Sequence, residues 1–332
     1  MGISRQQALD CLRSDDLIGI GMEADAMRRR LHPEGVVSYA VEGTVSMPDG
    51  MCADGKAGET SLDALYGKIA EMIDLGSTGV RLVSGLSSDS KNNRIEWFVG
   101  IVHGIRQRFP SLWLEGLSAT EVVALAAGNG LNLRETISRL RDAGLDSIAS
   151  NDIHSKCTFS EWIAVHRAAH GLGMPTVATM TFGAGETLQQ RVDTLAALRQ
   201  LQEETGGFAA FVPLAAIAPG GRELDAVTAV EQLKTLAIAR IFLDNFDNIQ
   251  WSGAAQGLKV LQMGLRFGAN DAGSVAPETL GAKPGNGASA AGVESAAAVA
   301  NHISEEDLRR IIRDAGFQPV QRDTAYRTMF LN

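Results

Sequence analysis

Short apolar runs alternate with longer amphipathic stretches along most of this 332-residue chain, and this alternation limits the possible folds more than any other feature. Such alternation is typical of βα units arranged around a parallel sheet. Eight units can be counted, which is the number that closes a (β/α)8 barrel of about 250 residues. The expected strands are Val36–Val41, Gly79–Val83, Leu112–Gly116, Ser147–Ala149, Thr176–Met180, Ala209–Pro213, Ile241–Leu243 with an extension at Ile249–Trp251, and Leu265–Phe267.

The segments between these runs predict helices. Apolar residues recur at spacings of three and four in Ser61–Leu75, Leu133–Ala143 and Leu188–Glu204. We expect a single α/β domain, and the parts assigned to it are an N-terminal helical extension at 1–34 with two short helices in Ser4–Leu31, a barrel at 35–275, a mobile Gly/Ala-rich loop at 276–302, and a C-terminal helix and tail at 303–332. Ser304 is the expected N-cap of that last helix.

Composition narrows the class of partner. A net charge of −9 leaves no basic surface for a phosphate backbone, so nucleic acid is excluded and a small-molecule substrate is expected. Neither a signal peptide nor an apolar run of about 18 residues occurs, so we expect a cytoplasmic protein with no membrane partner. Three well-separated cysteines suit a reducing compartment. The sequence leaves the oligomeric state open, and a homodimer is compatible with it.

Several motifs occur in a characteristic order. They are Leu31–Tyr39, Ala143–Ile148, Ala178–Gly183 with Glu186 and Thr187, Glu204–Phe208, Asp244–Asn245 with Asn248–Gln250, and Leu265–Asp271. In this order the chain resembles the radical S-adenosylmethionine (SAM) enzymes of the futalosine menaquinone pathway, dehypoxanthine futalosine cyclase and aminofutalosine synthase, which are related to deazaflavin FO synthase. The resemblance implies a radical-SAM-like (β/α)8 barrel of the TIM type with short N- and C-terminal helical extensions.

The chain departs from this family at the loop that follows the first strand. The family holds an iron–sulfur cluster there with three cysteines, whereas residues 46–59 contain Cys52 alone. Cys11 and Cys157 are too distant in sequence to complete the set. Because reductive cleavage of SAM needs an electron from the cluster, we expect neither a cluster nor radical chemistry. Residues 149–154 and the run after Glu278 also depart from the family pattern.

The candidate site consists of polar residues at the expected carboxyl ends of the strands, where barrel enzymes place their reactive groups. The resemblance implies that the Ser84-Gly85 turn and the Ser118-x-x-Glu121 motif contact SAM, although an N-cap with its first-turn acid is an alternative for the latter. The predicted SAM-binding residues are Ser84, Gly85, Glu115, Ser118, Asn151, Thr179 and Thr181; the predicted substrate-binding residues are Asp244, Asn245, Gln250, Asn270 and Asp271; the predicted catalytic residues are His154, Asp152 and Glu42.

These predictions have simpler alternatives. His154 is the candidate base because imidazole titrates near neutrality, but it could be a solvent-facing loop residue. Asp244-Asn245 and Asn270-Asp271 could form turn networks with their own backbone. Glu186 and Arg191 favour an ion pair at a helix start. His166 and His170 share a helix face that we assign to the surface, so no metal site is expected.

Two functions remain. The first is a cluster-free enzyme that uses SAM as a polar electrophile, by methyl transfer or by transfer, elimination or cyclisation of the amino-carboxypropyl group with release of methylthioadenosine, in small-molecule biosynthesis. The alternative is a catalytically silent SAM- or nucleoside-binding partner of an intact radical SAM enzyme. The polar residues that replace the cysteine loop favour the enzyme.

Overall fold

A computed structural model describes residues 2–47, 59–84, 95–149, 157–216, 227–277, 303–327 and 329–330. Its strands are β1 (Val36–Ser46), β2 (Gly79–Val83), β3 (Trp113–Gly116), β4 (Ser147–Ile148), β5 (Thr176–Phe182), β6 (Phe208–Ala215), β7 (Asn248–Ile249), β8 (Asp271–Val275), β9 (Gln318–Arg322) and β10 (Met329–Phe330). Its helices are α1 (Arg5–Arg13), α2 (Leu17–Leu31), α3 (Glu59–Asp74), α4 (Ile95–Arg108), α5 (Ala119–Asn129), α6 (Leu133–Ala143), α7 (Phe159–His170), α8 (Leu188–Thr205), α9 (Ala229–Phe242), α10 (Gly253–Gln256), α11 (Leu258–Gly264) and α13 (Glu305–Asp314).

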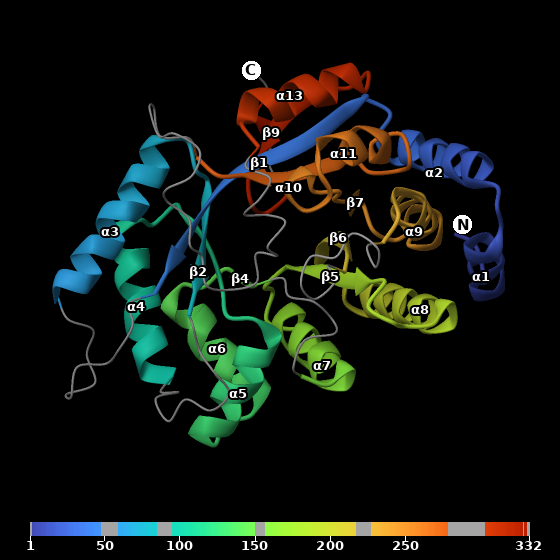
Figure 1. The fold of residues 1–332 in the computed structure, drawn as a ribbon. Coiled ribbons are helices and arrows are strands. Elements are labelled where there is room, and N and C mark those ends of the chain that lie inside the picture. Colours follow the sequence, from blue (N-terminus) through green and yellow to red (C-terminus); the bar gives the residue numbers. More distant parts are fainter. Residues whose placement is uncertain are drawn as a thin grey trace.

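Strands β1 to β8 form a parallel α/β barrel of the TIM type, with the helices on its outside (Figure 1). Strand β1 pairs with β2 on one side and β8 on the other, and an isolated bridge between Gln250 and Asp271 joins β7 to β8. No backbone ladder joins β4 to β5 within the described residues; there the Ser147 hydroxyl donates to the Pro175 carbonyl at 2.8 Å. The predicted fold is confirmed.

The two faces of β1 differ sharply. The Tyr39 hydroxyl points outward, where it donates to Glu305 of α13 at 2.6 Å and accepts from Arg309 at 2.8 Å. Gly43 also faces outward, because a Cβ there would meet the Met72 side chain of α3. Since side chains alternate along a strand, Ser38 and Glu42 lie on the inward face. The barrel interior is therefore polar at β1.

Both terminal helical segments match the sequence prediction. Helices α1 and α2 begin after the N-caps Ser4 and Asp16, and they pack against α8 and α9 (Figure 1). Helix α13 follows the expected N-cap Ser304, whose hydroxyl accepts from the Asp307 N–H at 3.0 Å. No helix in the described ranges is long and apolar enough to cross a membrane.

Two predicted strands are misplaced, although the extension Ile249–Trp251 of the seventh overlaps β7 at Ile249 and includes the Gln250 bridge to Asp271. Ile241–Leu243 is the end of the buried helix α9 and the residue that follows it, and Leu265–Phe267 is the turn after α11. A short apolar run does not distinguish a buried helix end from a strand, which explains both errors. The true strands are β7 and β8, and each begins a few residues later with a polar side chain, Asn248 or Asp271.

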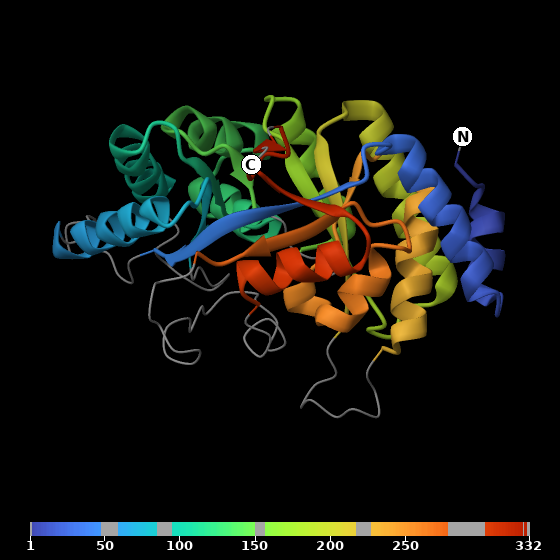
Figure 2. The same cartoon turned by 90° about the horizontal axis from the view of Figure 1, so that it is seen from above.

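The C-terminal tail adds two strands that the sequence analysis did not predict. Strand β9 pairs in parallel with the first half of β1, and β10 pairs with β9 (Figure 2). Beyond β9, the Thr324 hydroxyl lies 3.3 Å from the Thr78 hydroxyl, and the Arg327 guanidinium lies over the Trp113 ring at the start of β3. The tail thus runs beneath the amino ends of β2 and β3. The predicted loop 276–302 lies outside the described residues except for Ala276 and Pro277, and the domain boundaries stay predictions.

Candidate functional site

Three neighbouring strands place ionisable side chains in the barrel interior. They are Glu42 on β1, Arg81 on β2 and Glu115 on β3, and Arg81 is opposite Glu115 in the ladder. Arg81 Nη2 lies 3.4 Å from Glu115 Oε1, so these two form an ion pair. The Glu42 carboxylate accepts a hydrogen bond from Ser274 of β8.

A second ion pair comes from the C-terminal tail. Arg322 Nε and Nη2 donate to the two oxygens of Asp271 at 2.5 and 3.0 Å, and the Ser38 hydroxyl donates to the same carboxylate at 2.6 Å. The guanidinium lies 3.5 Å from the centre of the Tyr326 ring, and the Tyr326 hydroxyl donates to Oε1 of Gln250. The tail therefore brings its own side chains into the barrel interior.

Burial and charge shift the protonation of this cluster. Burial raises the pKa of Glu42 above the ordinary glutamate value and the Glu115 carboxylate raises it further, whereas Arg322, Arg81 and the Ser274 hydrogen bond act in the opposite direction. Burial raises the pKa of Tyr326 well above 10, although the Arg322 charge opposes this. A carboxyl group whose pKa is raised holds its proton more strongly than an ordinary glutamate, so Glu42 is a candidate general acid or base.

The structure describes most of the predicted SAM-binding residues, including both motifs except Gly85. The Ser84 hydroxyl, just after β2, donates to Oε1 of Glu121 in the first turn of α5. The other Glu121 oxygen accepts from the Ser118 N–H and hydroxyl at 2.7 Å each, so the Ser118-Glu121 capping box is also present. The structure thus brings the two predicted SAM motifs together, while Gly85 lies outside the described residues.

Two further predicted residues face the same interior. Thr176 at the start of β5 contacts histidines of the outer helix α7, so alternation directs Thr179 and Thr181 inward. Gln250 follows β7, and within the described residues its amide nitrogen makes no hydrogen bond. Asn151, Asp152 and His154 lie outside the described residues.

Asp244 and Asn245 are not placed to bind substrate. They precede β7 instead of following it, which puts them at the amino-terminal edge of the barrel. Asp244 pairs with Arg199 at 2.6 Å and accepts from the Gly2 N–H at 2.5 Å, and Asn245 donates to the Arg199 carbonyl at 2.9 Å. The prediction was wrong because it rested on the misplaced seventh strand.

Asn270 and Asp271 were likewise predicted from a misplaced strand, the eighth. Hydrogen bonds within the protein hold both side chains. The Asn270 side chain accepts from Arg240 at 2.6 Å and from the Ile249 N–H at 2.8 Å, and it donates to Asn248 at 2.9 Å. Asp271 is fully buried and its oxygens are occupied by Arg322 and Ser38. Of the five predicted substrate-binding residues, Gln250 alone faces the interior with a polar group to offer.

The surface assignment of two histidines is also wrong. His166 is fully buried, and its Nδ1 lies 2.8 Å from the Thr176 hydroxyl. His170 Nε2 lies 2.8 Å from the same hydroxyl, and burial lowers its pKa to about 4. The face of α7 that carries His166 and His170 packs against the barrel wall, where the Thr176 hydroxyl of β5 is their hydrogen-bond partner. By contrast, the predicted Glu186–Arg191 ion pair is confirmed at 2.6 Å.

Sequence reasoning missed Arg81, Ser274, Arg322 and Tyr326. Arg81 has a detectable signal, because it alternates with apolar Val80 and Leu82 in a correctly predicted strand. The other three had none, since β8 was misplaced and the tail was not expected to reach the barrel.

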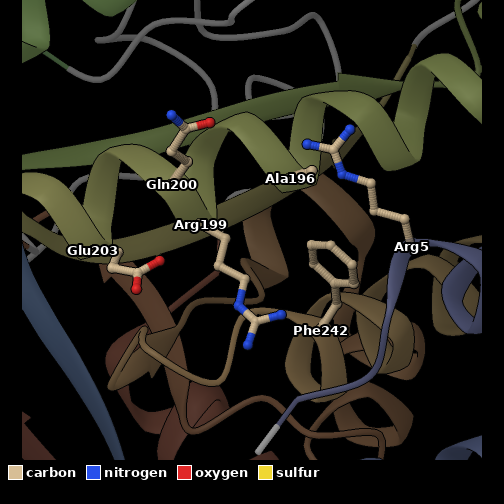
Figure 3. A pocket seen from close by; sticks show the side chains of 6 residues that line it. All are labelled: Arg5, Ala196, Arg199, Gln200, Glu203 and Phe242. Carbon is tan, nitrogen blue, oxygen red and sulfur yellow. The ribbon is translucent and has the colours of Figure 1, made fainter.

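A separate pocket of about 310 Å³ lies on the outer surface (Figure 3). Its lining comes from α1, α8 and α9 and consists of Arg5, Ala196, Arg199, Gln200, Glu203 and Phe242. Arg199 is already paired with Asp244, and Arg5 lies 3.8 Å from Asp193. The pocket belongs to the outer helical layer and not to the barrel interior.

The thiols of the described residues do not fit an iron–sulfur cluster. Cys11 lies on α1 and Cys157 is buried just before α7, so they come from separate elements. Burial raises the pKa of the Cys11 thiol, which disfavours a thiolate ligand. In the described ranges no group of three His, Cys, Asp or Glu side chains could hold a metal ion. Cys52 lies outside those ranges.

Comparison with known proteins agrees with the motifs. The C-terminal region of the CofH/MqnC proteins matches residues 205–331. The cyclic dehypoxanthine futalosine synthase of Streptomyces coelicolor is 32% identical over 98% of this chain and 85% of its own length. The 5-amino-6-(D-ribitylamino)uracil–L-tyrosine 4-hydroxyphenyl transferase of Methanococcoides burtonii is 33% identical over 88% of this chain and 87% of its own.

The fold comparison gives the same result. The hydrogenase maturase HydG of Carboxydothermus hydrogenoformans superposes with a TM-score of 0.69 and 14% identity, covering 98% of this chain and 78% of that one. At this identity the match speaks for the fold alone. The futalosine synthase match, which spans nearly the whole chain, establishes the family: the chain belongs to the radical SAM barrel enzymes that include the futalosine synthases and the CofH/MqnC proteins.

Proposed function

We propose that this chain is an enzyme that binds SAM in the barrel and uses it as a polar electrophile, without an iron–sulfur cluster. The observation that carries the proposal is the inward-facing Glu42 carboxyl, a proton acceptor set among polar groups of a family whose members use SAM. Polar SAM chemistry needs such a proton acceptor beside a positioned electrophile. It needs no supplied electron.

The wide spacing of the cysteines supports the same proposal. The sequence has three cysteines in all, and two of them lie on separate elements, as described above. Reductive cleavage requires a cluster held by three thiolates, and the proposed reaction does not involve such a cluster. The Ser84–Glu121 contact keeps the two motifs that would hold SAM side by side.

The proposed reaction balances without a further co-reactant. For methyl transfer, a nucleophilic atom of the acceptor bonds to the methyl carbon while the carbon–sulfur bond breaks, and its electron pair stays on sulfur to give S-adenosylhomocysteine. Attack at the amino-carboxypropyl chain releases methylthioadenosine in the same way. In both cases the proton of the nucleophile passes to a base, for which Glu42 and His154, with Asp152 nearby in sequence, are the candidates.

A catalytically silent protein that binds SAM or a nucleoside for an intact radical enzyme is the second candidate. The wide spacing of the cysteines supports this second candidate equally well. The ionisable interior disfavours it, because removing carboxylates such as Glu115 from water costs stability that a silent barrel could avoid with apolar side chains.

The test is product analysis. Purified protein is incubated with SAM, with and without a metabolite extract as acceptor source, and S-adenosylhomocysteine, methylthioadenosine and 5'-deoxyadenosine are quantified. We expect one of the first two. 5'-Deoxyadenosine as the main product would overturn the proposal, and SAM binding with no product in either condition would favour the silent protein.

A further inference from the structure

Among the described residues, two of the three carboxylates of this cluster form ion pairs. Asp271 is held by Arg322, and Glu115 by Arg81. Within the described residues no arginine, lysine or histidine nitrogen lies at ion-pair distance from Glu42, whose hydrogen-bond donor is the neutral Ser274 hydroxyl. In the part of the chain that the structure describes, three carboxylates therefore face two guanidinium groups, and Glu42 is the carboxylate without an ion-pair partner.

Contacts with other groups hold Arg322 in place beside Asp271. Arg322 uses Nε and Nη2 on Asp271 and donates from Nη1 to the Asp323 carbonyl at 3.0 Å, so each of its three nitrogens already makes a hydrogen bond. Its guanidinium is also fixed against the Tyr326 ring. The groups that face Glu42 are Arg81 from β2, Glu115 from β3, Asp271 and Ser274 from β8, and Arg322 and Tyr326 from the tail. A proton or a cationic ligand would complete this set.

We propose that Glu42 selects the charge of the ligand: it stays ionised when the barrel holds a cationic ligand, the sulfonium of SAM, and takes up a proton when the ligand is neutral, as in S-adenosylhomocysteine. This inference rests on the proposed function, because it assigns SAM to the barrel. Glu42 thereby favours substrate over product. Binding of SAM then releases a proton wherever free Glu42 is protonated, and binding of the product does not.

The direction of the pH dependence follows from this. Because burial raises the pKa of Glu42, the fraction of free protein with an ionised Glu42 grows as the pH rises through that value. The preference for SAM over S-adenosylhomocysteine should grow with it and disappear at lower pH, where Glu42 is neutral. One partly screened charge at a separation of several ångströms changes the affinity ratio by roughly tenfold.

The experiment is calorimetric titration of SAM and S-adenosylhomocysteine into wild-type protein and Glu42→Gln at several pH values, in two buffers of different ionisation enthalpy. The matched control is Glu305→Gln, because Glu305 contacts the opposite, outward face of β1 through Tyr39. We expect Glu42→Gln to lower the SAM preference about tenfold, to leave the S-adenosylhomocysteine affinity nearly unchanged and to abolish proton release, with Glu305→Gln like wild type. Thermal melting confirms that each variant folds.

The outcomes separate the two proposals. If wild-type protein binds SAM but Glu42→Gln keeps the same affinity ratio and the same proton release, the role of Glu42 is overturned while the proposed function stands. If neither ligand binds to wild-type protein, the proposed function falls and this inference falls with it.

Discussion

Arg322 and Asp271 are 51 residues apart in sequence and form a bidentate ion pair inside the barrel, with hydrogen bonds of 2.5 and 3.0 Å. Both side chains are almost fully buried, with exposed fractions of 2% and 0%. Burial by itself would lower the pKa of Arg322, but the Asp271 carboxylate raises it above the ordinary arginine value. The pair binds the last strand of the chain to the interior of the barrel.

Asp271→Asn should therefore destabilise the fold. The substitution keeps the size of the side chain but deprives the buried Arg322 charge of its bidentate partner, which costs about 3–5 kcal/mol. Urea unfolding followed by circular dichroism measures this loss. The control is Asp307→Asn, whose partner Arg310 is exposed and whose loss should not be measurable. An unchanged unfolding midpoint in Asp271→Asn would show that the pair contributes no stability.

His170 should make stability fall in weak acid. Burial lowers its pKa to about 4 in the folded protein, against about 6.5 in the unfolded chain, so below pH 6.5 the unfolded state binds the proton first. Its contribution is fully present above about pH 6.5 and is lost as the pH falls toward 4, by roughly 2–3 kcal/mol at about pH 4.5.

His170→Gln tests this, because glutamine can still hydrogen-bond Thr176 and does not titrate. The difference in unfolding free energy between about pH 7 and pH 4.5 should be smaller in His170→Gln than in wild type by that amount. His103→Gln, at an exposed position of α4, is the control. Equal pH dependence in wild type and His170→Gln would refute the role of burial.

The first six strands could be predicted from sequence because their apolar runs are bounded by turns and helix caps. Strand β2, for example, has the predicted bounds Gly79–Val83. Strand β8 could not be predicted, and β7 was predicted only through the extension Ile249–Trp251, because each strand starts with a polar residue whose partner is distant in sequence. The register of Asp271 with Ser38 is visible only once β1 and β8 are paired.

The residues of the candidate site divide in the same way, between those on correctly predicted strands and those on strands that were misplaced or not expected. Glu42, Glu115, Thr179 and Thr181 were chosen because they lie near the carboxyl ends of expected strands, and these strands are correct, so the four side chains face the barrel interior. Asp244 was misassigned because an error of a few residues in a strand moves a side chain to the opposite end of a barrel. Tyr326 could not be found, because its place depends on the pairing of β9 with β1, and nothing local to residues 318–326 indicates it.

The purified protein should hold no iron–sulfur cluster. Thiolates from one loop hold the clusters of this family, and residues 46–59 contain one cysteine. Anaerobic reconstitution with iron and sulfide, followed by iron and sulfide assay and absorption spectroscopy, measures the loading. Cys52→Ser should give the same low iron content as wild type. Loading near four irons per chain would contradict this prediction.

Gly85→Val should abolish SAM binding. The resemblance to the family places the backbone of the Ser84-Gly85 turn against the methionine part of SAM, and a branched side chain would fill the space that glycine leaves. Calorimetric titration with SAM measures the affinity. Gly67→Val is the control, because Gly67 is exposed on α3 with nothing within 4 Å of the added Cβ. If Gly85→Val folds and binds SAM with wild-type affinity, SAM binds elsewhere.

His154 and Glu42 are competing candidates for the base, and their variants should separate the roles. An imidazole titrates near pH 6.5, so His154→Gln should lower turnover to S-adenosylhomocysteine or methylthioadenosine about a hundredfold or more while nearly preserving SAM affinity. Glu42→Gln should change the ratio of SAM to S-adenosylhomocysteine affinity as well as the rate, because its charge also faces the ligand.

The pH dependence of turnover identifies the base. If wild-type turnover rises with pH through one ionisation, this rise should be lost only in the variant that lacks the base. His103→Gln, on the outer helix α4, should match wild type throughout. Wild-type turnover in His154→Gln, with the pH dependence lost in Glu42→Gln, would assign proton transfer to Glu42 and leave His154 as a loop residue.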